Sequence, residues 1–165
     1  MKILGIDPGS SRMGFGIIEY SPALRLIECG VAENKEKALA QKLSAVSISL
    51  QGLIEKHRPD CASLEKIFFS KNQKTAIEVA QARGVILYLL TKNNIPVIEF
   101  GPQEVKMLIT GYGLSDKKAV ASMVKKILGI QEIKGYDDVS DALAIAIAAA
   151  NPLTIKGLTD KGTAI

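Results

Sequence analysis

Nine successive residues without a polar side chain, Ala142 to Ala150, constrain the fold of this chain more than any other feature. They follow an acidic start near Asp137 and end at Asn151-Pro152, which predicts one helix from about Asp137 to Ala150. A helix that is apolar on all sides must be covered by protein around most of its circumference. The stretch is far shorter than the roughly 18 residues of a membrane span, so we expect a sheet to supply that cover.

The chain up to Phe100 predicts such a sheet. Three β-rich runs separated by turn-prone residues come first and favour an antiparallel meander, and two more runs each follow a long helix. The predicted strands are Met1–Asp7, Phe15–Tyr20, Leu24–Val31, Asp60–Glu65 and Ile95–Phe100, and the helices are Asn34–His57 and Asn72–Lys92. The predicted fold class is α/β, with a five-stranded mixed sheet of three antiparallel and then two parallel strands, flanked by helices.

Only helices are predicted beyond that sheet. One runs from Gln103 to Thr110, and a second runs from Ser115, its predicted cap, to Leu128. A chain of 165 residues, 47% of them hydrophobic, matches the size and core of one domain. We predict a single domain over residues 1–152 and a short flexible tail over residues 153–165, to which we assign no function.

The composition permits an anionic partner without requiring one. The chain has 21 basic and 17 acidic residues, a net charge of +4 and a pI near 9.0, a balance that many domains carry as a solvated surface. Cys29 and Cys61 have no zinc-like spacing and are predicted to be reduced core residues. Because the sequence contains neither a secretory signal nor an apolar run of membrane length, we expect a cytoplasmic protein without membrane association.

Two carboxylates stand at the ends of predicted strands. Asp7 closes an apolar run, where a buried charge needs hydrogen-bond donors or a cation, and its alternative role is a turn aspartate bonded to the amides of Gly9 or Ser10. Glu65 ends a strand of central composition, and its alternative is an exposed strand end. Either residue alone is therefore compatible with a purely structural role.

Two more carboxylates open the apolar helix. Asp138 and Asp141 are three residues apart, so they share one helix face, and the first turn favours acidic residues for purely structural reasons as well. Packed across the sheet, the helix would bring both to the ends of the strands that carry Asp7 and Glu65. No matching arginine is expected among these side chains, so they need cations. Oxygen ligands favour Mg²⁺ or Mn²⁺, and two ions about 4 Å apart could support phosphodiester cleavage.

Four motifs in order carry a family resemblance. They are LGIDPGSSRMGFGII at the start, LEKIFFSKN from Leu64, QARGV from Gln81 and DVSDALAIAIA from Asp138. From about residue 2 to 150 the chain resembles the RuvC family of Holliday-junction resolvases, the crossover junction endodeoxyribonucleases. The resemblance implies a ribonuclease H-like fold and a homodimer that nicks four-way DNA junctions symmetrically with Mg²⁺ during recombination and repair. It also implies the RuvA and RuvB branch-migration proteins as partners.

The resemblance also assigns residues. Catalysis and metal binding fall on four carboxylates: Asp7, Glu65, Asp138 and Asp141. Some relatives carry a histidine near the last of these, whereas this chain has Leu143, so an all-carboxylate site without another cofactor is implied. DNA contacts fall on aromatic and basic residues: Phe68, Phe69, Lys71, Lys106, Lys117 and Lys118. Aromatic side chains interleaved with lysines suit base stacking beside phosphates.

Three other residues receive weaker assignments. Arg83 matches the family without a clear role, and Gly84 costs about 1 kcal/mol in a helix unless close packing, by analogy near a dimer axis, repays it. His57, the only histidine, is predicted to be a helix-end residue beside Arg58-Pro59.

Other functions fit parts of the same pattern. A ribonuclease H-like enzyme acting on RNA, such as one that processes ribosomal RNA, resembles the chain weakly from Asp7 to Gly16. Asp7-Pro8-Gly9 also resembles the phosphate loop of sugar kinases and actin-like ATPases, but those proteins bind nucleotide between two such domains. A non-catalytic junction-binding protein would fit the basic balance, although four clustered carboxylates would repel phosphate.

Overall fold

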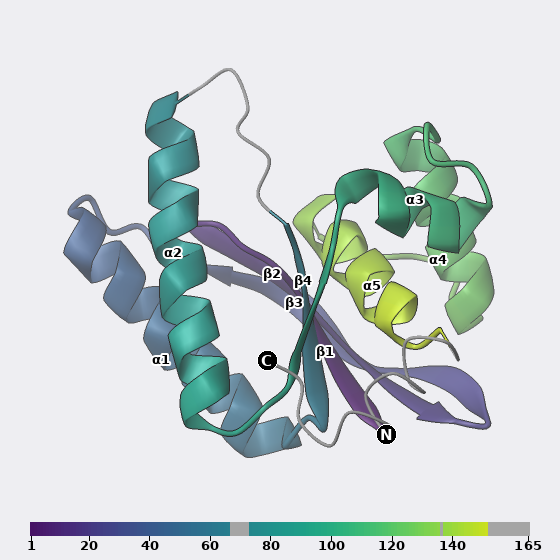
Figure 1. Ribbon diagram of the computed structural model, residues 1–165, viewed down its shortest axis with the longest axis horizontal. Coiled ribbons are helices and arrows are strands. Elements are labelled where there is room, and N and C mark those ends of the chain that lie inside the picture. The colour runs from purple at the N-terminus through teal and green to yellow at the C-terminus, as the bar shows by residue number, and fades with distance from the viewer. Residues whose placement is uncertain (67–72, 136, 152–165) are drawn as a thin grey trace.

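The computed structural model describes residues 1–66, 73–135 and 137–151, and these form one mixed sheet covered by helices on both faces (Figure 1). The strand order is β3-β2-β1-β4-β5. The strands are β1 (Lys2–Asp7), β2 (Arg12–Ser21), β3 (Ala23–Glu33), β4 (Cys61–Glu65) and β5 (Val97–Phe100). β1 to β3 pair antiparallel, whereas β4 pairs parallel with β1 and with β5. The prediction of three antiparallel and then two parallel strands is confirmed.

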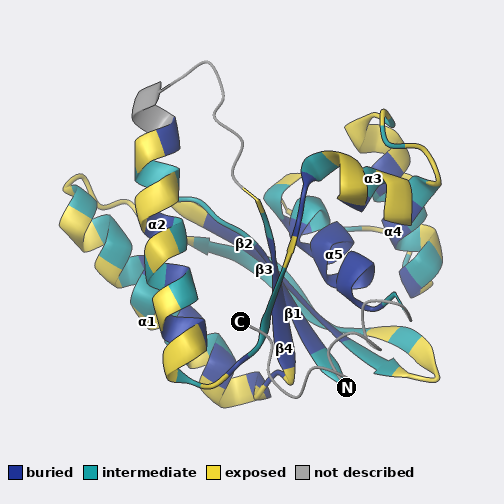
Figure 2. Ribbon diagram, in the orientation of Figure 1, coloured by how far each residue is buried: buried dark blue, intermediate teal, exposed yellow. Residues whose placement is uncertain are grey.

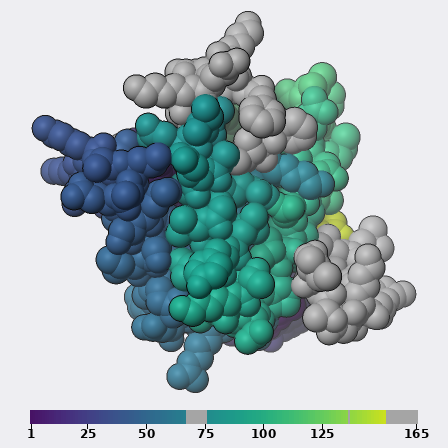
Figure 3. Space-filling view, turned by 60° about the vertical axis from the view of Figure 1, so that its left-hand side comes forward, coloured from purple at the N-terminus to yellow at the C-terminus, as the bar shows by residue number. Residues whose placement is uncertain are grey.

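The helices divide between the two faces of the sheet. They are α1 (Leu39–His57), α2 (Gln73–Lys92), α3 (Pro102–Thr110), α4 (Lys117–Leu128) and α5 (Asp137–Ala149). Figure 1 shows α1 and α2 together on one side, and Figure 3 shows α2 along the middle of one molecular face with α1 beside it. The other three helices cover the opposite side. Alternation along β1 supports both layers, since Ile3 packs toward α5 and Leu4 toward α1 and α2.

Helix α5 lies directly against the sheet because glycines leave room for its backbone. A Cβ atom at Gly5 would lie 2.1 Å from the carbonyl oxygen of Ala142, and one at Gly14 would lie 2.2 Å from that of Asp138. The hydroxyl of Ser63, on the neighbouring strand β4, donates to the carbonyl oxygen of Ile145 at 3.0 Å. Figure 2 shows the body of α5 as buried. The apolar helix therefore receives the cover that its composition requires.

Several predicted boundaries were wrong. Strand β2 begins at Arg12 rather than Phe15, and α1 begins at Leu39 rather than Asn34, since β3 continues to Glu33. The cap of α4 is Asp116 rather than Ser115, because the Asp116 Oδ1 accepts a hydrogen bond from the Ala119 amide at 2.7 Å.

The cysteines are free, as predicted. Cys61 is buried, whereas Cys29 on β3 is only half-buried. Burial raises the pKa of the Cys61 thiol to about 11, so this residue is a core side chain rather than a reactive one. No helix within the described ranges is long and apolar enough to cross a membrane.

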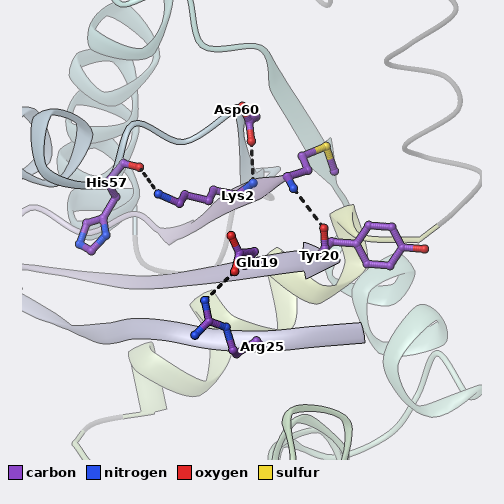
Figure 4. A network of polar contacts seen from close by, with 7 residues as sticks. Lys2, Glu19, Tyr20, Arg25, His57 and Asp60 are labelled. Atoms are coloured by element: carbon purple, nitrogen blue, oxygen red, sulfur yellow. Dashed lines mark hydrogen bonds and ion pairs between the residues drawn. The ribbon is translucent and has the colours of Figure 1, made fainter. Parts of the chain in front are cut away.

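Polar contacts close the end of the sheet where β1 begins (Figure 4). The Asp60 Oδ2 accepts a hydrogen bond from the Lys2 amide at 2.6 Å, and the Lys2 Nζ donates to the carbonyl oxygen of His57 at 3.3 Å. His57 is the last residue of α1, so its predicted place at a helix end is confirmed. Its Nε2 also lies 2.8 Å from the Glu28 Oε2.

Candidate active site

The sheet places two carboxylates beside each other at the other end of β1. In the parallel register of β1 and β4, Ile6 pairs with Leu64, so Asp7 and Glu65 follow as the next residues of adjacent strands. The first turn of α5 lies against this edge, because Gly14, which pairs with Asp7 across β1 and β2, approaches the Asp138 backbone. The strand ends and the helix start therefore meet, as predicted.

The charges of the four carboxylates influence one another. The pKa of Asp7 is raised from 3.8 to about 7, first by burial and then by the charges of Asp141, Glu65 and Asp138, in that order. Burial also raises the pKa of Glu65, followed by the charge of Asp141. We call these four residues the carboxylate cluster. Like charges in partly buried positions favour protonation, so near neutral pH the cluster holds a proton or needs cations.

The structural alternatives for the two strand-end residues do not hold. Within residues 1–66, 73–135 and 137–151, no hydrogen bond from the Gly9 or Ser10 amide reaches the Asp7 carboxylate. Glu65 is half-buried rather than an exposed strand end. Both carboxylates instead face their acidic neighbours at a cost in desolvation, which a purely structural role does not explain.

Among the described residues, two basic side chains contact the cluster. The Lys117 Nζ donates to the Asp141 Oδ2 at 2.9 Å and lies 4.0 Å from the Asp137 Oδ2. The Arg12 Nε lies 3.3 Å from the Asp138 Oδ2. The expectation that no arginine matches these carboxylates was therefore wrong. Arg12 was missed because β2 begins three residues earlier than predicted; the turn after Asp7 and the antiparallel return of the chain are the signals that could have located it.

The donor set of the cluster fits a hard divalent cation. Among the described residues no three acidic, histidine or cysteine side chains have the arrangement of a formed metal site, and Asp138 and Asp141 are turned toward Arg12 and Lys117. All four groups nevertheless offer only carboxylate oxygens, the ligands that Mg²⁺ and Mn²⁺ prefer. The buried Asp138 Oδ2 accepts no hydrogen bond within the described part of the chain, and burial together with the charges of its acidic neighbours raises the pKa of Asp7 to about 7.

A cavity of about 320 Å³ opens beside the cluster. Glu65 and Asp141 line it together with Lys106 on α3 and Lys117 on α4, and Val105 contributes to its apolar wall. The charges of Lys117 and Lys106 lower the pKa of Glu65. Negative and positive side chains thus share one opening, which suits a phosphodiester held between metal-binding carboxylates and lysines.

Of the other predicted DNA contacts, only Lys118 lies among the described residues. Lys118 is exposed on α4 but does not line the cavity. Phe68, Phe69 and Lys71 lie outside the described residues, so their assignments stay predictions.

The two weaker family matches lie on α2. Arg83 forms an ion pair with Glu99 on β5, which joins the helix to the edge of the sheet. A Cβ atom at Gly84 would meet no described atom within 4 Å, so the described chain itself does not provide the close packing expected there.

Comparison with known proteins identifies the family. The family model described as "Crossover junction endodeoxyribonuclease RuvC" matches residues 3–149. The chain belongs to the RuvC family. The crossover junction endodeoxyribonuclease RuvC of Fusobacterium nucleatum is 41% identical over 158 residues, which cover 94% of this chain and 83% of that protein. Its counterpart in Thermosipho melanesiensis is 44% identical over 148 residues, which cover 88% of this chain and 94% of that protein.

A solved RuvC structure agrees with the fold. The structure of T. thermophilus RuvC in complex with Holliday junction substrate superposes with a TM-score of 0.87 at 28% identity and covers 94% of this chain and 96% of that one. The predicted ribonuclease H-like fold and the resemblance to RuvC are thereby confirmed. The protein is a nuclease by family, while the roles of individual residues stay predictions.

Proposed function

We propose that this RuvC-family protein resolves four-way DNA junctions by nicking two strands symmetrically in a metal-dependent reaction. The observation that carries the proposal is the carboxylate cluster, in which burial and then three acidic neighbours raise the pKa of Asp7 to about 7. Ionising these buried, neighbouring carboxylates costs free energy, and bound divalent cations would offset that cost. The junction-bound RuvC relative supports the choice of substrate.

The carboxylates would hold Mg²⁺, with Mn²⁺ as a substitute and two ions in each site. Bound metal would supply an activated water and stabilise the leaving oxygen of the phosphodiester. Asp7 is the central ligand in this proposal, because its carboxylate is influenced by all three of the others: Glu65, Asp138 and Asp141. These residues offer only oxygen donors and none of the nitrogen or sulfur ligands that zinc favours.

The lysines around the cavity would position the DNA backbone. Lys106 and Lys117 line the opening beside Glu65 and Asp141, so a phosphate there would meet two ammonium groups. Lys117 would exchange its contact with Asp141 for the phosphate once metal neutralises that carboxylate. Phe68 would stack on an unpaired base, with Phe69, Lys71 and Lys118 as further contacts.

The proposed assembly is a homodimer, which would place two active sites on one junction. The open space at Gly84 on α2 suits a close approach by a second copy of the chain. Cooperation with RuvA and RuvB and a cytoplasmic location complete the proposal, and both rest on family membership.

A synthetic mobile four-way junction tests this function. The protein is incubated with it, with and without Mg²⁺, and the nicks are mapped on all four strands. We expect paired nicks at symmetric positions in Mg²⁺ alone, and we expect Asp7→Asn to bind the junction without cutting it. Nicking without divalent metal, or preferential cleavage of a structured RNA assayed in parallel, would overturn the proposal. Full cutting by Asp7→Asn would remove Asp7 from the mechanism.

A further inference from the structure

We propose that Arg12 is a positioning residue that couples junction binding to metal binding. Without DNA its guanidinium pairs with Asp138, and on the junction it moves to a backbone phosphate and leaves that carboxylate for the metal. The inference rests on the proposed function and gives a role to Arg12, which lies in the first motif but has no role among the residues that the resemblance or the proposed set of DNA contacts assigns. It concerns how the site is loaded rather than which residues hold the ions.

The contact between Arg12 and Asp138 is suited to exchange. The Arg12 Nε lies 3.3 Å from the Asp138 Oδ2, and that oxygen is buried but accepts no hydrogen bond from the described residues. These two atoms therefore attract each other by charge without an aligned hydrogen bond, and an ion pair whose arginine is about half exposed contributes little. The Arg12 side chain is 47% exposed, so it can reach a ligand from solvent.

Only the Arg12 side chain would have to move for this exchange of partners, because the backbones of β2 and α5 are packed together. Arg12 is the first residue of β2, and two residues later Gly14 fits against the Asp138 carbonyl so closely that a Cβ atom would lie 2.2 Å from it. The strand and the first turn of α5 are thus fixed relative to each other. Rotation of the arginine away from the carboxylate would need no movement of either element.

The chemistry of the guanidinium favours the proposed second partner. Arginine stays charged at all relevant pH values, and its planar set of donors matches the oxygens of a phosphate. The same guanidinium cannot neutralise Asp138 and a DNA phosphate fully at once. Junction binding should therefore raise the affinity of the site for metal, and by linkage metal should raise the affinity for the junction by the same factor.

Arg12 and Lys117 are the two basic residues that contact the cluster within the described ranges, and their substitutions would have different effects. Lys117 lies on the proposed DNA-binding cavity, so its substitution would change DNA affinity directly. Arg12 does not line that cavity and contacts Asp138 from the start of β2, so a change in metal affinity without DNA isolates its competition with the ion.

The test is isothermal calorimetry of Mn²⁺ binding to the full chain, with and without a junction. The junction carries a 3′-bridging methylene phosphonate at the mapped nick positions, which keeps the charge and prevents cleavage. For the parent we expect tighter Mn²⁺ binding on the junction. For Arg12→Gln we expect binding roughly two- to fivefold tighter without DNA, the equivalent of one lost surface ion pair, and a smaller gain on adding DNA. Arg12→Lys should restore part of the coupling.

Arg25→Gln is the matched control. Arg25 donates to the Glu19 Oε2 at 2.6 Å at the other end of the β2–β3 ladder, as Figure 4 shows, so its substitution also removes one arginine and one ion pair. We expect parental Mn²⁺ affinity with and without DNA. An equal gain in Mn²⁺ affinity in Arg25→Gln would show that the effect of Arg12→Gln comes only from the change in net charge, and it would overturn the inference.

Two failures can be told apart. If the parent binds Mn²⁺ through Asp7 and nicks junctions, but Arg12→Gln shows parental metal affinity and parental coupling, the inference fails alone. If the parent binds no Mn²⁺, or if Asp7→Asn binds it as tightly as the parent, the proposed function fails and the inference fails with it.

Discussion

Replacing Asp7 by asparagine should stabilise the metal-free protein while it abolishes nicking. Asp7 has its pKa raised from 3.8 to about 7 by burial and by its acidic neighbours, so its ionised form is unfavourable in the folded state. At about 1.4 kcal/mol per pH unit, this rise corresponds to about 4 kcal/mol of stability lost when the group is fully ionised. The asparagine amide also loses water on folding, so we expect a net gain of about 2 kcal/mol at pH 8.

The gain should depend on pH in a defined direction. Between pH 3.8 and about 7 the folded protein keeps a proton on Asp7 that the unfolded chain has lost, so stability falls as the pH rises through this window. Above about 7 both states are ionised and the difference is constant. The stability gap between Asp7→Asn and the parent should therefore widen from pH 5 to pH 7 and stay level from pH 7.5 to 8.5.

Thermal denaturation in EDTA measures this gap. For a chain of this size, 2 kcal/mol corresponds to roughly 4–8 °C in melting temperature. Asp60→Asn, at the other end of β1, is the charge-matched control and should show no comparable widening. Excess Mg²⁺ should narrow the gap, because only the parent keeps the ligand. A gap that stays constant from pH 5 to 8 would refute the idea that burial and acidic neighbours raise the pKa of Asp7.

Three further predictions concern the same edge of the sheet. Mn²⁺ binding should release part of one proton from Asp7 at pH 6.5 and almost none at pH 8.5. Calorimetry in buffers of different ionisation enthalpy measures this release. Equal release at both pH values would contradict the raised pKa of Asp7. Gly14→Ala should lower the free energy of unfolding in urea by about 1–3 kcal/mol and weaken metal binding, because the new Cβ atom would meet the Asp138 carbonyl. Gly52→Ala is the control and should not destabilise the protein, because a Cβ atom there has open space around it. Asp116→Ala should cost about 1 kcal/mol in the same assay through loss of the α4 cap, and Asp116→Asn should keep most of that stability; equal losses would argue against capping.

That the four carboxylates lie close together could be predicted from the sequence, because their positions depend on two strand ends and on one helix start. Asp7 and Glu65 each end an apolar strand, and adjacent parallel strands finish at the same edge of a sheet. Asp138 and Asp141 open a helix so apolar that it had to cross the sheet. These patterns extend over whole elements, so small errors in boundaries did not disturb them.

The contact made by Arg12 could not be predicted with the boundaries that were assigned. Its strand was expected to begin at Phe15, which would have left Arg12 in a loop, and the hydrogen-bonding register that carries β2 back to Arg12 is a tertiary property. The cap of α4 was missed for a related reason, because Ser115 and Asp116 are both good caps and only the backbone conformation selects Asp116. Local chemistry alone does not distinguish such neighbours.

We propose that acidic side chains from β1, β4 and α5 bind the same metal. Anomalous diffraction from crystals soaked in Mn²⁺ tests it most directly, because the ion is located independently of any assay of cutting. We predict an anomalous peak within about 2.5 Å of oxygens from Asp7 and from at least two of Glu65, Asp138 and Asp141. Full Mn²⁺ occupancy elsewhere on the protein, with no peak between these carboxylates, would contradict the account.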